Sequence, residues 1–406
     1  MSLAVPAGPG WLRTGDWFDR GLTRRLAAVL FALQLAGFLF VVAGTHGWIT
    51  PLDRPTTTDF VSFYAAGALA DAGTPQLAYD QAAHQAAEEK ATSSGVEYRF
   101  FNYPPVYMIV CAALAYLPYL AAFLLFETAT LALFLAVTCR IAGDHSLTAI
   151  LVLLAFPMVF WTFGLGQNAF LTAGLFGAAT LLIDQRPVVA GLLFGAICYK
   201  PHFGLLVPVA LAAGGYWRAF AGAAVSVAVL VLASLALFGV ETWHAFLAAI
   251  AASPQTYQSG RILFDGFVSP FGAVRLLGGG TSLAYSAQAV AALLVAVAVF
   301  VAWRRNLSLP LRAAALTAGA LVAAPVALLY ELMLGAIAGA WLVRADPAAN
   351  RLPLALLFVA LIPARAASEA LHIPVFPLVA LALFALVLWR AWQEMTGARS
   401  QTAGAA

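Results

Sequence analysis

Residues 26–49 have the sequence LAAVLFALQLAGFLFVVAGTHGWI, which contains no Asp, Glu, Lys or Arg. A straight helix needs roughly 20 apolar residues to cross a bilayer, so this run is long enough to do so. It is also longer than the apolar core of a signal peptide, and we therefore expect a retained first membrane span. Four arginines precede it, which predicts a cytoplasmic N-terminus and places residue 50 on the outer face.

Apolar runs continue through most of the chain, which predicts an all-α polytopic membrane protein with about 12 transmembrane helices, in a range of roughly 10 to 13. Several runs are shorter than a straight crossing requires, so we expect broken helices around an internal cavity. After residue 49 the runs cover 104–118, 119–139, 147–165, 168–183, 188–214, 219–239, 284–303, 312–329, 331–344, 352–364 and 373–392.

The composition excludes several other classes of protein. Hydrophobic residues make up 63% of the 406 residues and charged residues only 10%, whereas soluble domains carry roughly 25% charged residues. The apolar residues come in long runs rather than in alternation, which argues against a β-barrel. A net charge of +3 with scattered basic residues argues against nucleic-acid binding. The three cysteines, Cys111, Cys139 and Cys198, lie in apolar segments and are expected to be buried thiols.

The predicted organisation is a cytoplasmic segment over 1–25, one transmembrane domain over 26–393 and a cytoplasmic tail over 394–406. Two outer loops are expected, over 50–103 and 240–281, and the first should carry surface helices over 60–72 and 81–94. Eight arginines fall on inner connections in this count: Arg218, Arg304, Arg305, Arg312, Arg344, Arg351, Arg390 and Arg399.

Two arginines disagree with this count. Arg140 and Arg186 fall on the outer side if every apolar run is one crossing. Placing them on the inner side instead would make 188–214 a hairpin and change the number of crossings between 104 and 139. The sequence leaves both arrangements open.

Asp59 is the first candidate for chemistry. It follows three threonines and precedes Phe60, at the expected start of a helix in the first outer loop. Hydroxyl groups, amides and the helix dipole would surround its carboxylate there. The same position suits an N-cap residue, and the two roles are compatible.

Lys200 is the second candidate, because it is one of two lysines in the chain and stands inside an apolar run. A charged side chain inside a membrane is costly and is by default a functional hypothesis with an anionic partner. Pro201 and His202 follow it. A turn between two short helices would also explain a lysine at this position.

Other polar residues interrupt the apolar runs. Gln167 and Asn168 could line a polar cavity or bond to neighbouring helices, and Tyr330 and Glu331 could add a second carboxylate or the partner of an arginine. Glu127 is expected to be paired. Tyr103, before Pro104 and Pro105, is expected to be mainly structural. The sequence shows no Walker loop, nucleotide fingerprint, Ser/His/Asp grouping or histidine cluster with metal-ligand spacing.

Seven short motifs occur in order along the chain. They are Asp59-Phe60 with Tyr64-Ala65-Ala66-Gly67, Ala78-Tyr79-Asp80, Phe101-Asn102-Tyr103-Pro104-Pro105, Gly166-Gln167-Asn168, Arg186-Pro187, Ala190-Gly191 and Tyr199-Lys200-Pro201. In this order they resemble glycosyltransferase family 87, also called DUF2029, which includes polyprenol-phosphate-mannose-dependent α-mannosyltransferases. The resemblance covers about residues 55–220 well and the C-terminal half loosely.

This resemblance implies a GT-C fold and a sugar donor carried on polyprenyl phosphate, with no nucleotide and no metal expected. Asp59 matches the acid of the family and would be the general base. Those mannosyltransferases carry a late histidine motif, whereas this chain has Ala324-Pro325 and Tyr330-Glu331 in that region, so sugar and acceptor stay open.

An inverting transfer needs a base for the attacking hydroxyl and cations for the departing phosphate. We assign the phosphate to Lys200, Arg261 and His202. The sugar or acceptor pocket is assigned to Tyr64, Gln167, Asn168, Tyr330 and Glu331.

The predicted function is transfer of a hexose, with mannose the first choice, to a hydroxyl of a lipid or envelope glycan. The alanine-rich, arginine-over-lysine composition suggests a bacterial inner membrane with the site facing the periplasm. Two alternatives stay open. A secondary transporter would also have many spans and intramembrane charges, and a binding or scaffold protein of envelope assembly would bind a lipid-linked sugar without turnover.

Overall fold

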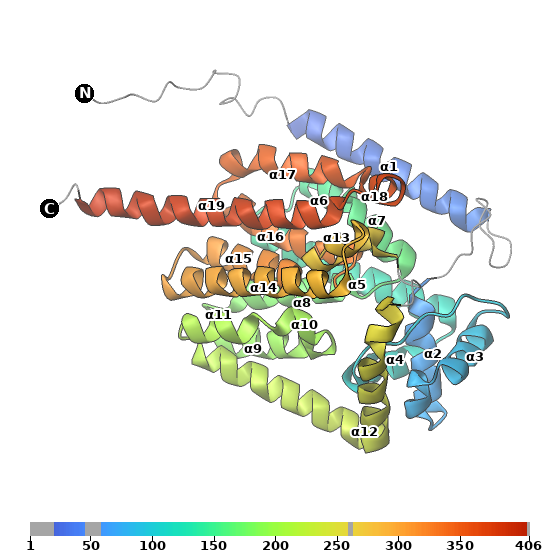
Figure 1. Ribbon diagram of the computed structural model, residues 1–406. Coiled ribbons are helices and arrows are strands. Elements are labelled where there is room, and N and C mark those ends of the chain that lie inside the picture. The colour runs from blue at the N-terminus through green and yellow to red at the C-terminus, as the bar shows by residue number, and fades with distance from the viewer. Residues whose placement is uncertain (1–19, 45–57, 259–262, 404–406) are drawn as a thin grey trace.

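The structure is a computed structural model that describes residues 20–44, 58–258 and 263–403 (Figure 1). All regular secondary structure in these residues is helical, apart from one isolated bridge between Phe267 and Leu328. The predicted all-α class is therefore confirmed. The five long helices are α1 (Arg20–Ala43), α5 (Tyr119–Ala142), α12 (Trp217–Gln258), α14 (Thr281–Arg304) and α19 (Val375–Ala403).

Shorter helices fill the space between these five. In the first half of the chain they are α2 (Phe60–Asp71), η3 (Pro75–Tyr79), α3 (Gln81–Ala91), α4 (Pro105–Ala115), α6 (Leu147–Leu154), α7 (Pro157–Leu165), α8 (Ala169–Leu182), α9 (Pro187–Ala196), η4 (Ile197–Tyr199), α10 (Pro201–Gly204) and α11 (Val207–Ala213). In the second half they are η5 (Phe264–Gly266), α13 (Pro270–Leu276), α15 (Leu309–Ala323), η6 (Leu329–Leu332), α16 (Met333–Ala345), α17 (Pro347–Leu361) and α18 (Ala364–Leu371).

Within residues 20–44, 58–258 and 263–403, five helices are long and apolar enough to cross a membrane, and two bent pairs raise the number to seven. The pairs are α6 with α7, bent by 59°, and α17 with α18, bent by 52°. The chain is thus a multi-pass membrane protein with broken helices, but the predicted count of 12 is not confirmed. Prolines explain many breaks, because α4, α7, α9 and α10 each begin with a proline, which fits a first helical turn and interrupts a longer helix.

One end of the bundle gathers arginines, and we call it the arginine end. There the Tyr216 hydroxyl donates to the Asp184 carboxylate and accepts from Arg312 Nη1 at 3.0 Å. Arg344 Nη1 donates to the Ile141 carbonyl at 3.2 Å, which places the last turns of α5 and α16 together.

Arg140 and Arg186 consequently lie at the same end of the bundle as Arg312 and Arg344, which agrees with the second of the two arrangements that the sequence left open. The run 188–214 is a hairpin in which α9 leads away from the arginine end and α10 and α11 return to it. The run 104–118 holds only the 11-residue α4.

The opposite end carries Asp59 and we call it the Asp59 end. There α2 lies against α4, α3 and η3 (Figure 1). A Cβ atom on Gly67 would stand 2.1 Å from the Cys111 carbonyl oxygen, so only glycine allows this approach of α2 to α4. The helix expected over 60–72 is present as α2, and seven of its twelve residues are buried because α4, α3 and η3 pack around it.

Helix α12 extends into the segment predicted as the outer loop 240–281. The backbone bends at Gly239, where φ is 76° and ψ is 167°, a conformation that glycine adopts readily. Beyond the bend the helix continues to Gln258 and contacts η3 and α4, with the Phe246 and Tyr79 rings 5.7 Å apart. Its bent far end, in yellow, is visible beside α4 in Figure 1.

Candidate functional site

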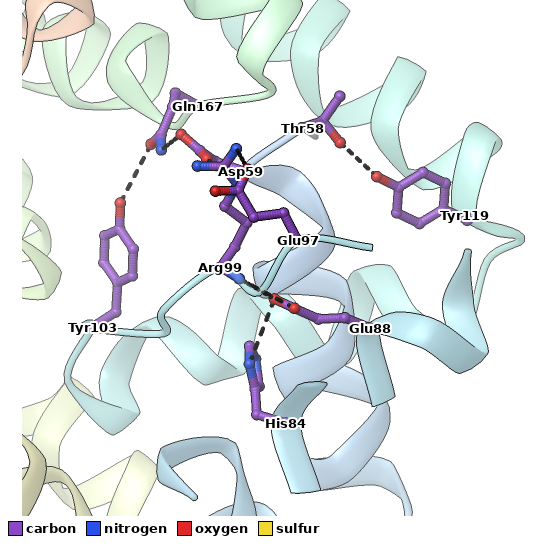
Figure 2. A network of polar contacts seen from close by, with 9 residues as sticks. All are labelled: Thr58, Asp59, His84, Glu88, Glu97, Arg99, Tyr103, Tyr119 and Gln167. Atoms are coloured by element: carbon purple, nitrogen blue, oxygen red, sulfur yellow. Dashed lines mark hydrogen bonds and ion pairs between the residues drawn. The ribbon is translucent and has the colours of Figure 1, made fainter. Parts of the chain in front are cut away.

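Asp59 occupies the N-cap position of α2, as its sequence context predicts. Its side chain makes no capping hydrogen bond, and instead Oδ2 accepts a hydrogen bond from Gln167 Nε2 at 2.7 Å (Figure 2). The Asp59 amide donates to the Leu165 carbonyl at 2.6 Å. The carboxylate is thus turned away from its own helix and is held by the turn between α7 and α8.

Gly166 makes this contact between α2 and the α7–α8 turn possible. It ends α7 with φ of 68°, and a Cβ atom there would lie 2.6 Å from Cβ of Phe60. A side chain at this position would therefore push the turn away from the first residue of α2. Gly166 sets the distance at which Gln167 reaches Asp59.

Arg99 supplies the positive charge beside Asp59. Its Nε lies 3.6 Å from Asp59 Oδ1, and its Nη2 donates to Glu97 Oε2 at 3.0 Å (Figure 2). The Arg99 side chain is 33% exposed and the Asp59 side chain 22% exposed, so the pair is at the margin of the protein interior. Burial raises the pKa of Asp59 above its usual value, and the charge of Arg99 opposes this shift.

A buried acid positions the Arg99 backbone. Both Glu88 carboxylate oxygens accept from the Arg99 amide at 3.2 Å. Glu88 is fully buried and faces His84 Nδ1 at 3.6 Å, while His84 Nε2 donates to the Ser62 carbonyl at 3.1 Å. Burial raises the pKa of Glu88 to about 7 and lowers the pKa of His84 to about 4. His84 is therefore neutral at pH 7 and presents an unprotonated Nδ1 to Glu88.

We predict that Glu88→Gln gains stability relative to the native chain as the pH rises from about 5 to 8. Burial raises the pKa of Glu88 from its ordinary value of 4.5 to about 7, so the folded chain keeps this proton at pH values where the unfolded chain has lost it. The free energy of unfolding of the native chain therefore decreases as the pH rises through this range. The lowered pKa of His84 makes the free energy of unfolding increase between about pH 4 and pH 6.5, and this effect is the same in both proteins. The difference between the two melting temperatures therefore isolates Glu88.

Melting temperatures in detergent at pH 5, 6, 7 and 8 check this prediction. Glu89→Gln is the matched control, because Glu89 is the next residue and its carboxylate accepts from the Gly95 amide near the surface. A difference between native and Glu88→Gln that is constant with pH would show that Glu88 does not titrate in this range.

Tyr103 connects the Asp59 contacts to a second polar group. Its hydroxyl lies 3.4 Å from Gln167 Oε1 and 3.5 Å from Asn168 Oδ1, which are weak contacts. Its ring lies 5.9 Å from Lys200 Nζ. The Asn168 amide nitrogen is buried and has no hydrogen-bond partner within the described residues. Asp59, Gln167, Tyr103 and Lys200 therefore form one continuous series of contacts.

Lys200 and Glu331 form a buried ion pair, separated by 131 residues in the chain. Each side chain is 4% exposed. Lys200 stands at the break between η4 and α10, and Glu331 lies in η6, so both come from interruptions of helices. The anionic partner expected for Lys200 is thus Glu331, and the turn between short helices that could explain the lysine is also present. The second Glu331 oxygen has no hydrogen-bond partner in the part of the chain that the structure describes.

The other predicted site residues lie at varied positions. The Tyr64 hydroxyl donates to the Leu117 carbonyl at 2.9 Å, while the Tyr330 ring lies 5.8 Å from Lys200 Nζ. The His202 ring is 4.4 Å from that of Phe203 and half-buried. Arg261 lies outside the described residues.

Glu127 is fully buried, and the prediction that it is paired is wrong, because neither carboxylate oxygen has a hydrogen-bond partner among the described residues. Glu127 lies in α5, whose one basic residue is Arg140, 13 residues further along the helix, so no neighbouring residue of this helix can pair with it. No group of three or more His, Cys, Asp or Glu side chains suited to a metal ion occurs within 20–44, 58–258 and 263–403.

Sequence reasoning missed three residues of this site: Arg99, Glu88 and Tyr103. Arg99 offered a signal, because it is the single basic residue between Lys90 and Arg140. Tyr103 was assigned a structural role from its prolines, and its hydroxyl contacts could not be foreseen from them. Glu88 looked like one acid among many in a polar segment.

This arrangement is suited to proton abstraction beside an anionic group. A carboxylate with a raised pKa is a better base than an ordinary one, and the Gln167 amide fixes its orientation. The adjacent guanidinium can bind a phosphate through charge-assisted hydrogen bonds. A base and a cation of this kind are what a group transfer from a phosphate carrier requires.

The model of one protein family, glycosyltransferase family 87, matches residues 100–330. The match covers more than half of the chain and includes Tyr103, Gln167, Asn168 and Lys200, whereas Asp59 precedes it. No curated protein and no solved structure matches the chain. The match favours an enzyme over the transporter and scaffold alternatives. With its apolar helices, the chain is a multi-pass membrane glycosyltransferase and belongs to glycosyltransferase family 87.

Proposed function

We propose that the protein transfers a sugar from a polyprenyl-phosphate donor to a hydroxyl of a lipid or envelope glycan, with inversion at the anomeric carbon. A hexose is the proposed sugar, with mannose the first choice. The proposal rests on one observation above all: Asp59 is held between the Gln167 amide and the Arg99 guanidinium at one end of a membrane bundle. The sequence resemblance to polyprenol-phosphate-dependent transferases with a GT-C fold supports it.

In the proposed reaction Asp59 accepts the proton of the attacking hydroxyl while the hydroxyl oxygen forms a bond to the anomeric carbon. The bond from that carbon to the phosphate oxygen breaks, and polyprenyl phosphate leaves with the electron pair. Arg99 stabilises the charge that develops on this phosphate. The reaction as proposed uses no nucleotide and no metal.

Arg99 is proposed as the main cation at the phosphate, because Lys200 is paired with the buried Glu331. Lys200 and His202 are proposed as secondary contacts of the phosphate. Gln167 and Asn168 lie beside the base and are proposed to contact sugar or acceptor, together with Tyr330 and Glu331. Tyr64 and Arg261 remain predictions for the pocket and the phosphate.

We further propose that the Asp59 end faces the periplasm of a bacterial inner membrane. The arginine end then lies in the cytoplasm, in agreement with the excess of arginine and lysine on cytoplasmic connections. Its members include Arg140, Arg186, Arg312 and Arg344. Both chain termini would also be cytoplasmic.

A donor panel tests the proposed substrate class. Purified protein in lipid is incubated with polyprenyl-phosphate sugars or with nucleotide sugars, each with a mixture of lipid and glycan acceptors, and products are identified by mass spectrometry. The proposal predicts release of polyprenyl phosphate from at least one lipid-linked donor. Turnover of nucleotide sugars alone would contradict it.

We expect Arg99→Gln to shift the acidic limb of the kcat/KM profile to higher pH. Asp59 must be ionised to act as a base, and loss of the neighbouring positive charge raises its pKa further. Arg99→Lys is the matched variant, because it keeps the charge and should leave the limb close to that of the native chain. If the acidic limb of the kcat/KM profile lies at the same pH for Arg99→Gln and Arg99→Lys, Arg99 does not act on Asp59 through its charge.

A further inference from the structure

A groove with a volume of about 840 Å³ opens at the arginine end, opposite Asp59. Its lining comes from the end of α11, the start of α12 and the end of α14, and α11 contacts both of these longer helices. The residues of α11 that line the groove are small or medium in size: Val209, Ala212 and Ala213. This seven-residue helix therefore leaves open space between its two long neighbours.

The two flanking helices expose apolar side chains along their length. On α12, Val229 is 57% and Leu232 64% exposed, and on α14, Leu293 is 65% and Val297 54% exposed. We expect exposed apolar residues on helices long enough to span a bilayer to contact lipid acyl chains. The groove opens beside these apolar surfaces, which favours a lipid over a soluble occupant.

The lining at the helix ends is aromatic and basic. Trp217 and Arg304 are exposed at the start of α12 and the end of α14, and both line the groove. Tyr216 and Trp303, also in the lining, have ring centroids 5.6 Å apart. Tryptophan at the level of the headgroups and arginine as a bidentate partner of phosphate are the chemistry that an anionic lipid requires.

A buried arginine increases the positive charge behind this lining. The Arg312 guanidinium is 5.6 Å from the Tyr216 ring and 5.4 Å from the Trp303 ring. Arg312 is 5% exposed, and the nearby Asp184 carboxylate lies 3.8 Å from its Nη2. Arg304 and Arg312 thus bring two positive charges to this end of the groove, and Asp184 is paired with Arg312 rather than with Arg304.

We propose that this groove binds an anionic phospholipid. Arg304 binds the headgroup phosphate, Trp217 lies at the headgroup level, and the acyl chains extend along the exposed faces of α12 and α14. This site is separate from Asp59 and does not depend on the proposed reaction.

The test measures binding of dioleoyl phosphatidylglycerol to the detergent-purified full chain by native mass spectrometry, with dioleoyl phosphatidylcholine as the neutral comparison. We expect Arg304→Gln to weaken phosphatidylglycerol binding roughly tenfold, as expected for loss of one charge-assisted hydrogen bond. Arg305→Gln is the matched control, because Arg305 is the next residue and exposed but does not line the groove.

A second variant, Ala212→Trp, places a large side chain in the groove and should abolish binding. Equal binding by Arg304→Gln and Arg305→Gln, or equal affinity for the two lipids, would overturn the proposal. Displacement of phosphatidylglycerol by inorganic phosphate at similar concentration would also overturn it, because the site would then recognise a soluble phosphate. If Ala212→Trp does not fold, the comparison of Arg304→Gln with Arg305→Gln decides alone.

Discussion

Asp59→Asn is expected to lower the rate of sugar transfer by a factor of about 10² to 10⁴, the usual contribution of a general base. Asparagine has nearly the same shape and can accept the Gln167 hydrogen bond, but it cannot take a proton from the acceptor hydroxyl. The substitution should not unfold the protein, because the amide of residue 59 still bonds to the Leu165 carbonyl. It also removes a carboxylate whose pKa is raised because burial disfavours its charged form.

Asp71→Asn is the control for this variant. Asp71 is the last residue of the same helix, α2, and is exposed. Steady-state rates and melting temperatures of the two variants are compared in the same detergent. A rate for Asp59→Asn close to that of Asp71→Asn would remove Asp59 from the chemical step.

Lys200→Met is expected to destabilise the fold by about 3–5 kcal/mol, the usual effect of removing one partner of a buried ion pair. The Glu331 carboxylate would be left charged in a buried position, without its cation. The melting temperature should fall on the order of 5–10 °C. The variant Lys200→Met/Glu331→Met should recover much of this loss, because no buried charge then remains unpaired.

Lys90→Met is the matched control, since Lys90 is the other lysine of the chain and is exposed on α3. Thermal unfolding of the native chain, Lys200→Met, Glu331→Met and the double variant completes a double-mutant cycle. If Lys200→Met melts with the native chain, or if the double variant is no more stable than the single one, the pair does not stabilise the fold.

The sequence predicted the helical class and membrane character but not how many runs cross the membrane. Run length cannot distinguish a crossing from a half helix, because the distinction depends on packing. The run 188–214 is long enough for one crossing, yet Lys200-Pro201 divides it. A loop is predicted for the segment that forms the far half of α12, because the preceding apolar run ends at Gly239. In the structure the helix bends at this glycine and then continues.

Asp59, Gln167 and Lys200 were named from sequence because polar groups next to apolar runs are conspicuous. The partners of these residues were harder to predict. Gln167 reaches Asp59 across 108 residues only because Gly166 allows the turn to approach α2. Glu331 and Lys200 were both singled out, but their pairing depends on two helix breaks that meet in space. Arg99 contacts Asp59 through a segment held by Glu88, which no sequence pattern indicates.

The most direct test of the central claim is the release of polyprenyl phosphate from a lipid-linked sugar by the native chain and by Asp59→Asn, both purified in the same lipid. Mass spectrometry measures the released carrier and the glycosylated acceptor together. We predict equal amounts of the two products from the native chain, and almost none from Asp59→Asn. Equal turnover by the two proteins would contradict the proposal that Asp59 is the base of a glycosyl transfer.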